Sequence, residues 1–303
     1  MNYLAQKISV LKKQKNAVIL AHTYQSGAVQ DIADFVGDSY GLSVEAARVK
    51  SDTIIFCGVS FMAETAAILN PHSTVILPAA DAGCPMADMI TAADLRELMH
   101  EHPNYLVVCY VNTTAEIKAL SHVCVTSSNA VKIVSKLPLD QGIIFVPDKY
   151  LGSFVMEQTG RPMVLWNGFC PTHARIKPDM LIAARREHPQ ATILIHPEAP
   201  DETRALADAV LSTGGMCDFV KQSSAVEFII ATELGIIHTL QTQSPGKKFY
   251  PVDQSVICPN MKKTTVHSVI NALEGTGGKK IVVPEDIAKS ALVSLQRMLD
   301  MAR

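Results

Sequence analysis

The chain has 303 residues, of which 48% are hydrophobic and 18% are charged, and its formal net charge is −2. With this charge balance the protein has no excess of positive charge to attract nucleic acid or an anionic membrane. No apolar run reaches the roughly 18–20 residues of a membrane-spanning helix. The first residues lack the apolar core of a signal peptide, so we expect a soluble cytoplasmic protein. Seven widely spread cysteines without a Cys-x-x-Cys pair argue against a disulfide framework and against zinc fingers.

Short apolar runs alternate with amphipathic stretches along the whole chain. We predict strands at 17–21, 53–56, 74–77, 105–109, 142–146, 163–166, 192–195 and 280–283, and helices at 92–101, 178–187 and 284–299. Apolar strands separated by helices indicate parallel sheets that are buried on both faces. The sequence therefore predicts an α/β protein with three-layer αβα units.

Three Cys-Pro dipeptides are the first sign of an internal repeat. Their cysteines are Cys84, Cys170 and Cys258, at intervals of 86 and 88 residues. Twenty-six residues after each cysteine, the chain reaches the end of a predicted strand, at Tyr110, His196 and Pro284. A common interval between a motif and a strand end indicates that the same supersecondary unit recurs.

A second spacing supports the repeat. Ser39, Ser127 and Thr213 each come seventeen residues after a strand-end residue, namely His22, Tyr110 and His196. Each hydroxyl residue stands just before a predicted helix start. Two independent spacings that agree predict a triplication with a period of about 87 residues.

The repeat also predicts the domain organisation. We expect three similar units at 1–82, 83–168 and 169–279, with 280–303 packing back on the first unit. Three such units can surround a pseudo-threefold axis. The loops at the carboxyl ends of their parallel strands would then face one another around a central site.

The three Cys-Pro cysteines suit a metal centre. Thiolates from three related loops could hold a [4Fe–4S] cluster with one iron left open as a Lewis acid. A zinc site with His173 or His196 as fourth donor is an alternative. A third possibility is that Cys-Pro merely ends strands with the thiols buried. The other cysteines show no such register, and we expect Cys57 to be packed inside a strand.

Polar side chains follow the first predicted strand of each unit. His22 and Tyr24, Tyr110 and Asn112, and His196 and Glu198 occupy equivalent positions. Imidazoles, phenols and a carboxylate are suitable acid–base groups. The hydroxyls at the three helix starts could cap helices only. They could equally seat carboxylate or phosphate groups, which would suggest a small polyanionic substrate.

At these residues the chain resembles the quinolinate synthetase A family over nearly its whole length. The matching segments are His22-Thr23-Tyr24-Gln25, Gly37-Asp38-Ser39, Gly58-Val59-Ser60-Phe61-Met62-Ala63-Glu64-Thr65, Tyr110-Val111-Asn112, Thr126-Ser127-Ser128-Asn129, Pro147-Asp148-Lys149-Tyr150-Leu151-Gly152, His196-Pro197-Glu198 and Ser212-Thr213-Gly214. Some members carry extra cysteines near the third ligand. This chain has only Cys258 there, as in the compact form of the family.

The resemblance implies a reaction and a set of site residues. The reaction is the condensation of iminoaspartate with dihydroxyacetone phosphate to quinolinate, phosphate and water, in de novo NAD biosynthesis. The implied ligands of one [4Fe–4S] cluster are Cys84, Cys170 and Cys258. The implied substrate-binding residues are His22, Ser39, Tyr110, Val111, Asn112, Ser127, His196, Pro197, Glu198 and Thr213. Tyr24 and Glu198 are the leading acid–base candidates, with Tyr110 and His22 as further catalytic candidates.

Other functions stay open at this point. A zinc-dependent lyase or aldolase could use the same cysteines with His173, and an iron–sulfur sensor could bind a partner without turnover. The set of polar groups argues against the sensor. A dinucleotide binder is weaker still, because no Gly-x-Gly-x-x-Gly follows a strand. We expect small-molecule substrates, with no nucleic acid or membrane partner, and a possible transient link to the enzyme that supplies iminoaspartate.

Overall fold

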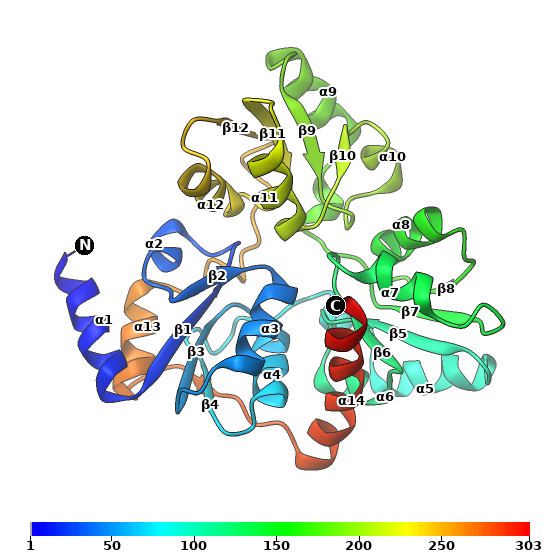
Figure 1. The fold of residues 1–303 in the computed structure, drawn as a ribbon. Helices are drawn as coiled ribbons and strands as arrows, with labels where there is room; N and C mark the ends of the chain where they lie inside the picture. The colour runs from blue at the N-terminus through cyan, green and yellow to red at the C-terminus, as the bar shows by residue number, and fades with distance from the viewer. Residues whose placement is uncertain (1) are drawn as a thin grey trace.

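The computed structural model describes residues 2–303. Three sheets, each covered by helices, form three αβα units that surround a common centre (Figure 1). The α/β prediction is therefore confirmed. Among the described residues, none of the helices combines the length and the apolar composition needed to span a bilayer.

The first unit contains the N-terminal elements. They are α1 (Asn2–Gln14), β1 (Ala17–His22), α2 (Gly27–Gln30), β2 (Phe35–Gly37), α3 (Ser39–Arg48), β3 (Thr53–Cys57), α4 (Ser60–Leu69) and β4 (Thr74–Leu77). The strands of this unit pair in the order β4-β3-β1-β2, and all of these pairs are parallel.

The second and third units repeat this arrangement. The second contains η1 (Ala87–Met89), α5 (Ala92–Glu101), β5 (Leu106–Tyr110), α6 (Ala115–Leu120), β6 (Val123–Val125), α7 (Ala130–Lys136), β7 (Ile143–Val146), α8 (Lys149–Thr159) and β8 (Val164–Leu165). The third contains η2 (His173–Arg175), α9 (Pro178–Glu187), β9 (Thr192–Ile195), α10 (Asp201–Arg204), β10 (Ala209–Val210), α11 (Thr213–Gln222), β11 (Glu227–Ala231), α12 (Ile236–Gln243) and β12 (Lys248–Pro251). Their strand orders are β6-β5-β7-β8 and β10-β9-β11-β12, so the first strand of each unit is interior to its sheet.

The sequence explains why these segments form strands and helices. Ile143 to Val146 are wholly buried in β7, and the central strands of the other sheets are similarly apolar, as expected for parallel sheets covered on both faces. Helix α5 begins with a capping box between Thr91 and Asp94. Helix α8 ends at Thr159 and is capped by Gly160, whose φ of 65° is the left-handed conformation that glycine adopts without a steric penalty.

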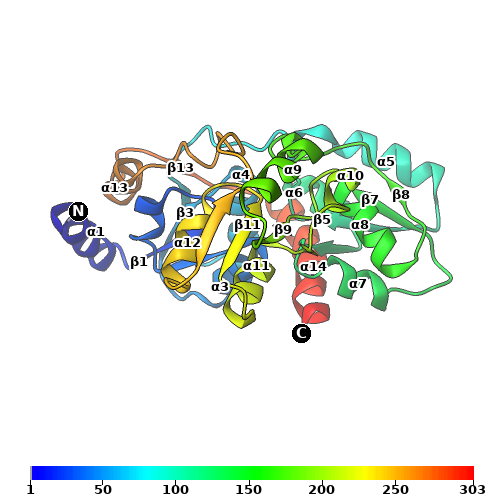
Figure 2. The ribbon, with the colours of Figure 1, turned by 90° about the horizontal axis from the view of Figure 1, so that it is seen from above.

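The C-terminal segment returns to the first two units. Helix α13 (Val266–Glu274) packs on α1, and β13 (Lys279–Lys280) pairs antiparallel with β4. Helix α14 (Glu285–Ala302) packs mainly on α6 and β6 and also contacts α4, so it lies between the first and second units (Figures 1 and 2). The division into 1–82, 83–168 and 169–279 stays a proposal.

The predicted strand at 280–283 is wrong beyond its first residue. Only Lys280 belongs to β13, and Pro284 caps α14 instead of following a strand. Ile281 donates one further backbone bond to Val75, but Val282 is 76% exposed and pairs with no strand. The chain therefore leaves the edge of β4 after Ile281, and the rest of the apolar run makes no ladder.

Candidate active site

A cavity of about 210 Å³ lies where the three units meet. Residues at and just after the carboxyl ends of β1, β5 and β9 line it together with the three Cys-Pro loops. The sequence-predicted residues that line it are His22, Tyr24, Ser39, Cys84, Tyr110, Asn112, Ser127, Cys170, His196, Glu198, Thr213 and Cys258. Two predicted residues, Val111 and Pro197, do not line this cavity. Val111 borders a smaller neighbouring cavity, and the Pro197 carbonyl accepts a bond from Arg204.

The three Cys-Pro loops present their sulfurs in the same way. Burial raises the pKa of the Cys84 thiol to about 12 and also raises the pKa values of Cys170 and Cys258. In each loop, one or two backbone N–H groups, two or three residues after the cysteine, hydrogen-bond to the sulfur and lower the pKa of the thiol. These N–H groups belong to Met86, Ala87, His173, Asn260 and Met261. Cys84 is close enough to the other two thiols for their charges to interact. Such N–H donors would stabilise thiolate ligands of a metal centre.

A buried carboxylate stands behind the Cys258 loop. Glu233 is fully buried just after β11 and accepts the Cys258 backbone N–H at 3.1 Å and the Gly235 N–H at 2.7 Å. Lys262 lies 2.8 Å from the same carboxylate and also donates to the Tyr24 carbonyl. The loop is therefore tied to the third sheet and to the segment after β1.

The second unit has a matching carboxylate. Asp148 is fully buried two residues after β7, and its Oδ1 caps α8 by accepting the N–H groups of Tyr150 and Leu151. The backbone N–H of Cys170 also points to this carboxyl group. Burial, followed by the charge of Glu198, raises the pKa of Asp148. Neither Asp148 nor Glu233 was predicted as a site residue, although both stand at the same distance after equivalent strands.

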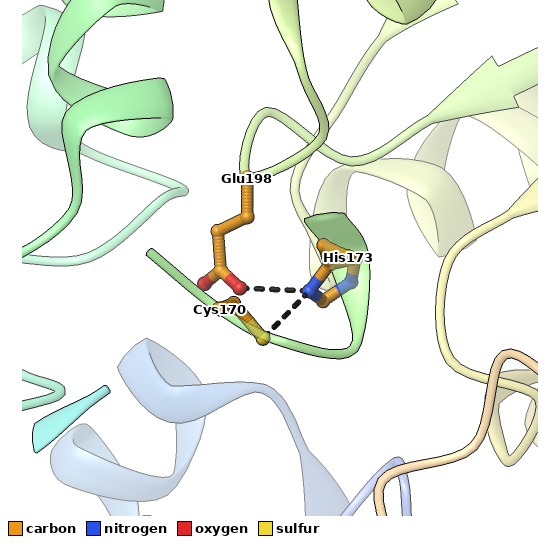
Figure 3. Close-up of side chains that lie close together, drawn as sticks. All are labelled: Cys170, His173 and Glu198. Atoms are coloured by element: carbon orange, nitrogen blue, oxygen red, sulfur yellow. Dashed lines mark hydrogen bonds and ion pairs between the residues drawn. The ribbon is translucent and has the colours of Figure 1, made fainter. Parts of the chain in front are cut away.

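A hydrogen-bonded network crosses the cavity beside these loops (Figure 3). His173 Nδ1 lies 2.7 Å from Glu198 Oε2 and 3.3 Å from the Cys170 sulfur. Tyr110 donates its hydroxyl to the other Glu198 oxygen. On the far side of the imidazole, Nε2 lies 2.7 Å from the hydroxyl of Thr232. Sequence analysis considered His173 only as a zinc donor and did not single out Thr232.

The protonation of this network follows from its surroundings. Burial works to raise the pKa of Glu198, but the charges of His173 and His196 and bonds from His173 and Tyr110 outweigh it and lower the pKa. Burial raises the pKa values of Tyr24 and Tyr110 well above the ordinary value. The carboxylate is therefore ionised and both phenols hold their protons at neutral pH.

Two further histidines occupy equivalent positions. His22 Nδ1 accepts the backbone N–H of Tyr24 at 3.1 Å, and His196 Nδ1 accepts that of Glu198 at 3.3 Å. Burial lowers the pKa of His22 to about 4 and that of His196 to about 3. Both rings are therefore neutral at pH 7, with the proton on Nε2.

Several polar atoms of the cavity wall have no partner within the protein. Helices α3 and α11 begin at Ser39 and Thr213, and Ser127 comes shortly before α7. Nearby, Asn112 Oδ1 and Thr126 Oγ1 are buried without a hydrogen-bond partner. Buried polar atoms normally find partners, so unpaired ones in a cavity wall indicate a ligand that satisfies them.

The comparison with known proteins identifies the family. A family model described as quinolinate synthetase A protein matches residues 6–300. The chain belongs to the quinolinate synthetase A family. A quinolinate synthase of Dehalococcoides mccartyi (strain CBDB1) is 49% identical over 296 residues, which cover 98% of this chain and 97% of the relative. The quinolinate synthase of Thermodesulfovibrio yellowstonii is 51% identical over 300 residues, or 99% and 98% of the two chains.

A third similar relative comes from another genus. The quinolinate synthase of Methanoregula boonei is 50% identical over 296 residues, covering 98% of this chain and 97% of the relative. Membership of the quinolinate synthetase A family makes this chain an enzyme of NAD biosynthesis. The resemblance stated from the motifs is confirmed.

Proposed function

We propose that the chain condenses iminoaspartate with dihydroxyacetone phosphate, giving quinolinate, phosphate and water. The observation that carries this proposal is one cavity in which three cysteine loops face two phenols, three imidazoles and the carboxylate of Glu198. We also propose that Cys84, Cys170 and Cys258 hold a [4Fe–4S] cluster there. A cytoplasmic location and a transient link to the enzyme that supplies iminoaspartate belong to the same proposal.

The donor set fits such a cluster better than a single zinc ion. Sulfurs bound to one zinc at about 2.3 Å can be at most about 4.6 Å apart. Among residues 2–303, the donor set within 4.8 Å of one another is Cys170, His173 and Glu198, not the three cysteines. The three thiols are therefore spaced more widely than the ligands of one zinc ion, and each sulfur has backbone N–H donors beside it. This arrangement suits a larger polynuclear group. When bound, that group would supply a Lewis acid at its open iron.

The residues of the chain account for the binding of substrate. The reaction uses two small molecules that carry carboxylates, a carbonyl and a phosphate. The neutral imidazoles of His22 and His196 offer Nε2–H donors to such oxygens. The hydroxyls of Ser39, Ser127 and Thr213 add donors beside helix starts, where negative charge is favoured.

The same residues account for proton transfer. Phosphate elimination, carbon–carbon bond formation and ring-closing dehydration all require protons to be taken from carbon or nitrogen and delivered to oxygen. Glu198 is ionised and can accept a proton, while Tyr24 and Tyr110 are protonated and can donate one. Their burial keeps bulk water away from reactive intermediates.

A zinc-dependent lyase or aldolase is the second candidate. The observation in its favour is the close set of Cys170, His173 and Glu198. However, His173 already donates to Glu198 at 2.7 Å, so the imidazole nitrogen nearest to the other donors is occupied by a hydrogen bond. Metal analysis separates the two candidates.

An anaerobic assay tests the proposal. The purified chain, loaded with iron and sulfide, is incubated with iminoaspartate and dihydroxyacetone phosphate, and quinolinate is measured by chromatography. We expect quinolinate and phosphate in equal amounts, and neither product when one substrate or the iron is left out. Absence of quinolinate from protein that carries its full iron and sulfide would contradict the proposed reaction.

A further inference from the structure

Arg204 is a buried guanidinium at the boundary between the second and third units. It ends α10, which packs against α8 across that boundary, and its side chain is 4% exposed (Figure 1). Its Nη1 lies 2.9 Å from the carbonyl oxygen of Ala199, 3.4 Å from that of Pro197 and 3.1 Å from that of Tyr150. A planar cation with several N–H donors can serve carbonyl groups that come from different segments of the chain.

Ion pairs do not explain the position of this side chain. Asp201 lies 3.0 Å from Nη1 and Glu157 lies 3.9 Å from Nη2, but the two acidic side chains are 58% and 69% exposed. Pairs of this kind contribute little to stability, and a buried charge is costly unless it is hydrogen-bonded. The backbone carbonyls are therefore the groups that hold the guanidinium inside the protein.

The turn after β9 depends on this side chain. Pro197 and Ala199 stand on either side of Glu198, and both residues are buried outside helices and strands. Among residues 2–303, Arg204 is the one donor to the Pro197 and Ala199 carbonyls. A buried carbonyl that loses its donor is destabilising, so the turn that carries Glu198 would move without Arg204.

The third carbonyl connects this turn to the second unit. Tyr150 lies in the first turn of α8, and the helix is capped there by the buried Asp148. The guanidinium carbon also lies 5.6 Å from the centre of the Phe154 ring on the same helix, an attractive contact for a cation. One side chain therefore holds the turn of Glu198 against the start of α8.

We propose that Arg204 is a positioning residue, which fixes the turn of Glu198 against the second unit so that the carboxylate meets both of its partners. One partner, Tyr110, belongs to the second unit and the other, His173, to the third. The two bonds can exist together only while these units keep their relative position. Arg204 does not line the cavity and acts through the turn. This inference rests on the proposed function, because it assigns Arg204 to the proton transfers of that reaction.

The first test compares Arg204→Met with Arg204→Lys. Methionine keeps an unbranched side chain but donates no hydrogen bond, whereas lysine keeps the charge and donates from one point. We expect Arg204→Met to lower kcat by about 10- to 10²-fold, the effect that a displacement of about 1 Å can have on reacting groups. Arg204→Lys should lie between this variant and the wild type. A wild-type kcat in Arg204→Met would overturn the inference.

Arg161 provides a matched control. Its guanidinium lies in the second unit, away from the cavity, and donates to backbone carbonyls at 2.7–3.1 Å, those of Val134, Leu137, Pro138 and Gln141. Arg161→Met thus removes a comparable set of bonds without changing the turn of Glu198. It should keep the wild-type kcat. Equal losses in the two methionine variants would reveal general destabilisation and overturn the inference.

A double variant shows whether Arg204 acts through Glu198. Once Glu198→Gln has removed the carboxylate, adding Arg204→Met should lower kcat by less than about threefold more, because groups that act as a unit are not additive. A residue with a general structural role would cause its full loss in both backgrounds. Additive losses in the double variant would therefore contradict the inference.

Hydrogen exchange measures the turn without turnover. The Glu198 N–H bonds His196 Nδ1, and the Ala199 N–H bonds the His196 carbonyl. In anaerobic holoprotein we expect faster exchange of the peptide that contains these amides in Arg204→Met, and no change in Arg161→Met.

Unchanged exchange in Arg204→Met would overturn the inference, whether or not the wild type forms quinolinate. Absence of quinolinate from the wild type would separately refute the proposed reaction. If Arg204→Met does not fold, Arg204→Lys takes its place in each comparison, and the same outcomes decide.

Discussion

Glu198 accepts hydrogen bonds from side chains of two different loops of the cavity. It lies between His173 and Tyr110, and its backbone N–H is fixed by His196. The carboxylate stays ionised despite its burial because His173 and Tyr110 hydrogen-bond to its two oxygens and lower its pKa. An ionised buried group in a cavity is suited to proton transfer, which is the role we propose for it.

Removing this charge tests the role of Glu198. Glu198→Gln keeps the size of the side chain but cannot accept a proton, so we expect turnover to fall by at least about 10²-fold. The iron content and visible spectrum should stay at the wild-type level, because Gln can accept the bond of His173 with its oxygen while its NH2 group donates to the Tyr110 hydroxyl. The exposed Glu202→Gln is a suitable control. Normal turnover in Glu198→Gln would exclude Glu198 from acid–base chemistry.

At the scale of elements, the Cys258 loop depends on the strand beside it. This loop leaves the third sheet after β12 and is held there by the ion pair between the buried Glu233 and the partly exposed Lys262. The same pair reaches the segment after β1 through Tyr24. The position of the third cysteine is therefore set by contacts to both units and not by the loop alone.

Breaking this pair should loosen the loop. Glu233→Gln leaves the partly exposed Lys262 without its charged partner, and we expect the free energy of unfolding to fall by about 1.5 kcal/mol. We also expect faster loss of iron to a chelator, measured by the decay of visible absorbance. Glu227→Gln removes a similar pair at an exposed lysine and should change neither property by a comparable amount. Equal rates of iron loss in wild type and Glu233→Gln would contradict the anchoring role.

Local sequence patterns predicted most, but not all, of the elements. The helices at 92–101 and 178–187 were predicted with the observed bounds of α5 and α9, since each has an apolar face and a clear start. The predicted strands omit the short β2, β6 and β10, because two or three residues are fixed by pairing and not by local preference. They also omit β11 and β12, although the repeat places β11 in register with β3 and β7.

At the scale of the whole molecule, the repeat predicted the cavity and local patterns could not. Spacing alone selected Cys84, Cys170 and Cys258 and the residues after β1, β5 and β9, which the structure brings to one cavity. Contacts such as that between Thr232 and Tyr24 could not be predicted. They join positions 208 residues apart and depend on how the third unit is placed against the first.

The central claim is that one [4Fe–4S] cluster bridges the three units. Its most direct test is the iron and sulfide content of anaerobically reconstituted protein, measured for the wild type and for serine variants of each Cys-Pro cysteine. We predict about four irons and four sulfides per chain in the wild type. Cys84→Ser, Cys170→Ser and Cys258→Ser should each lose them, and Cys217→Ser should not. One zinc per chain, or full iron in any of the three variants, would contradict the account.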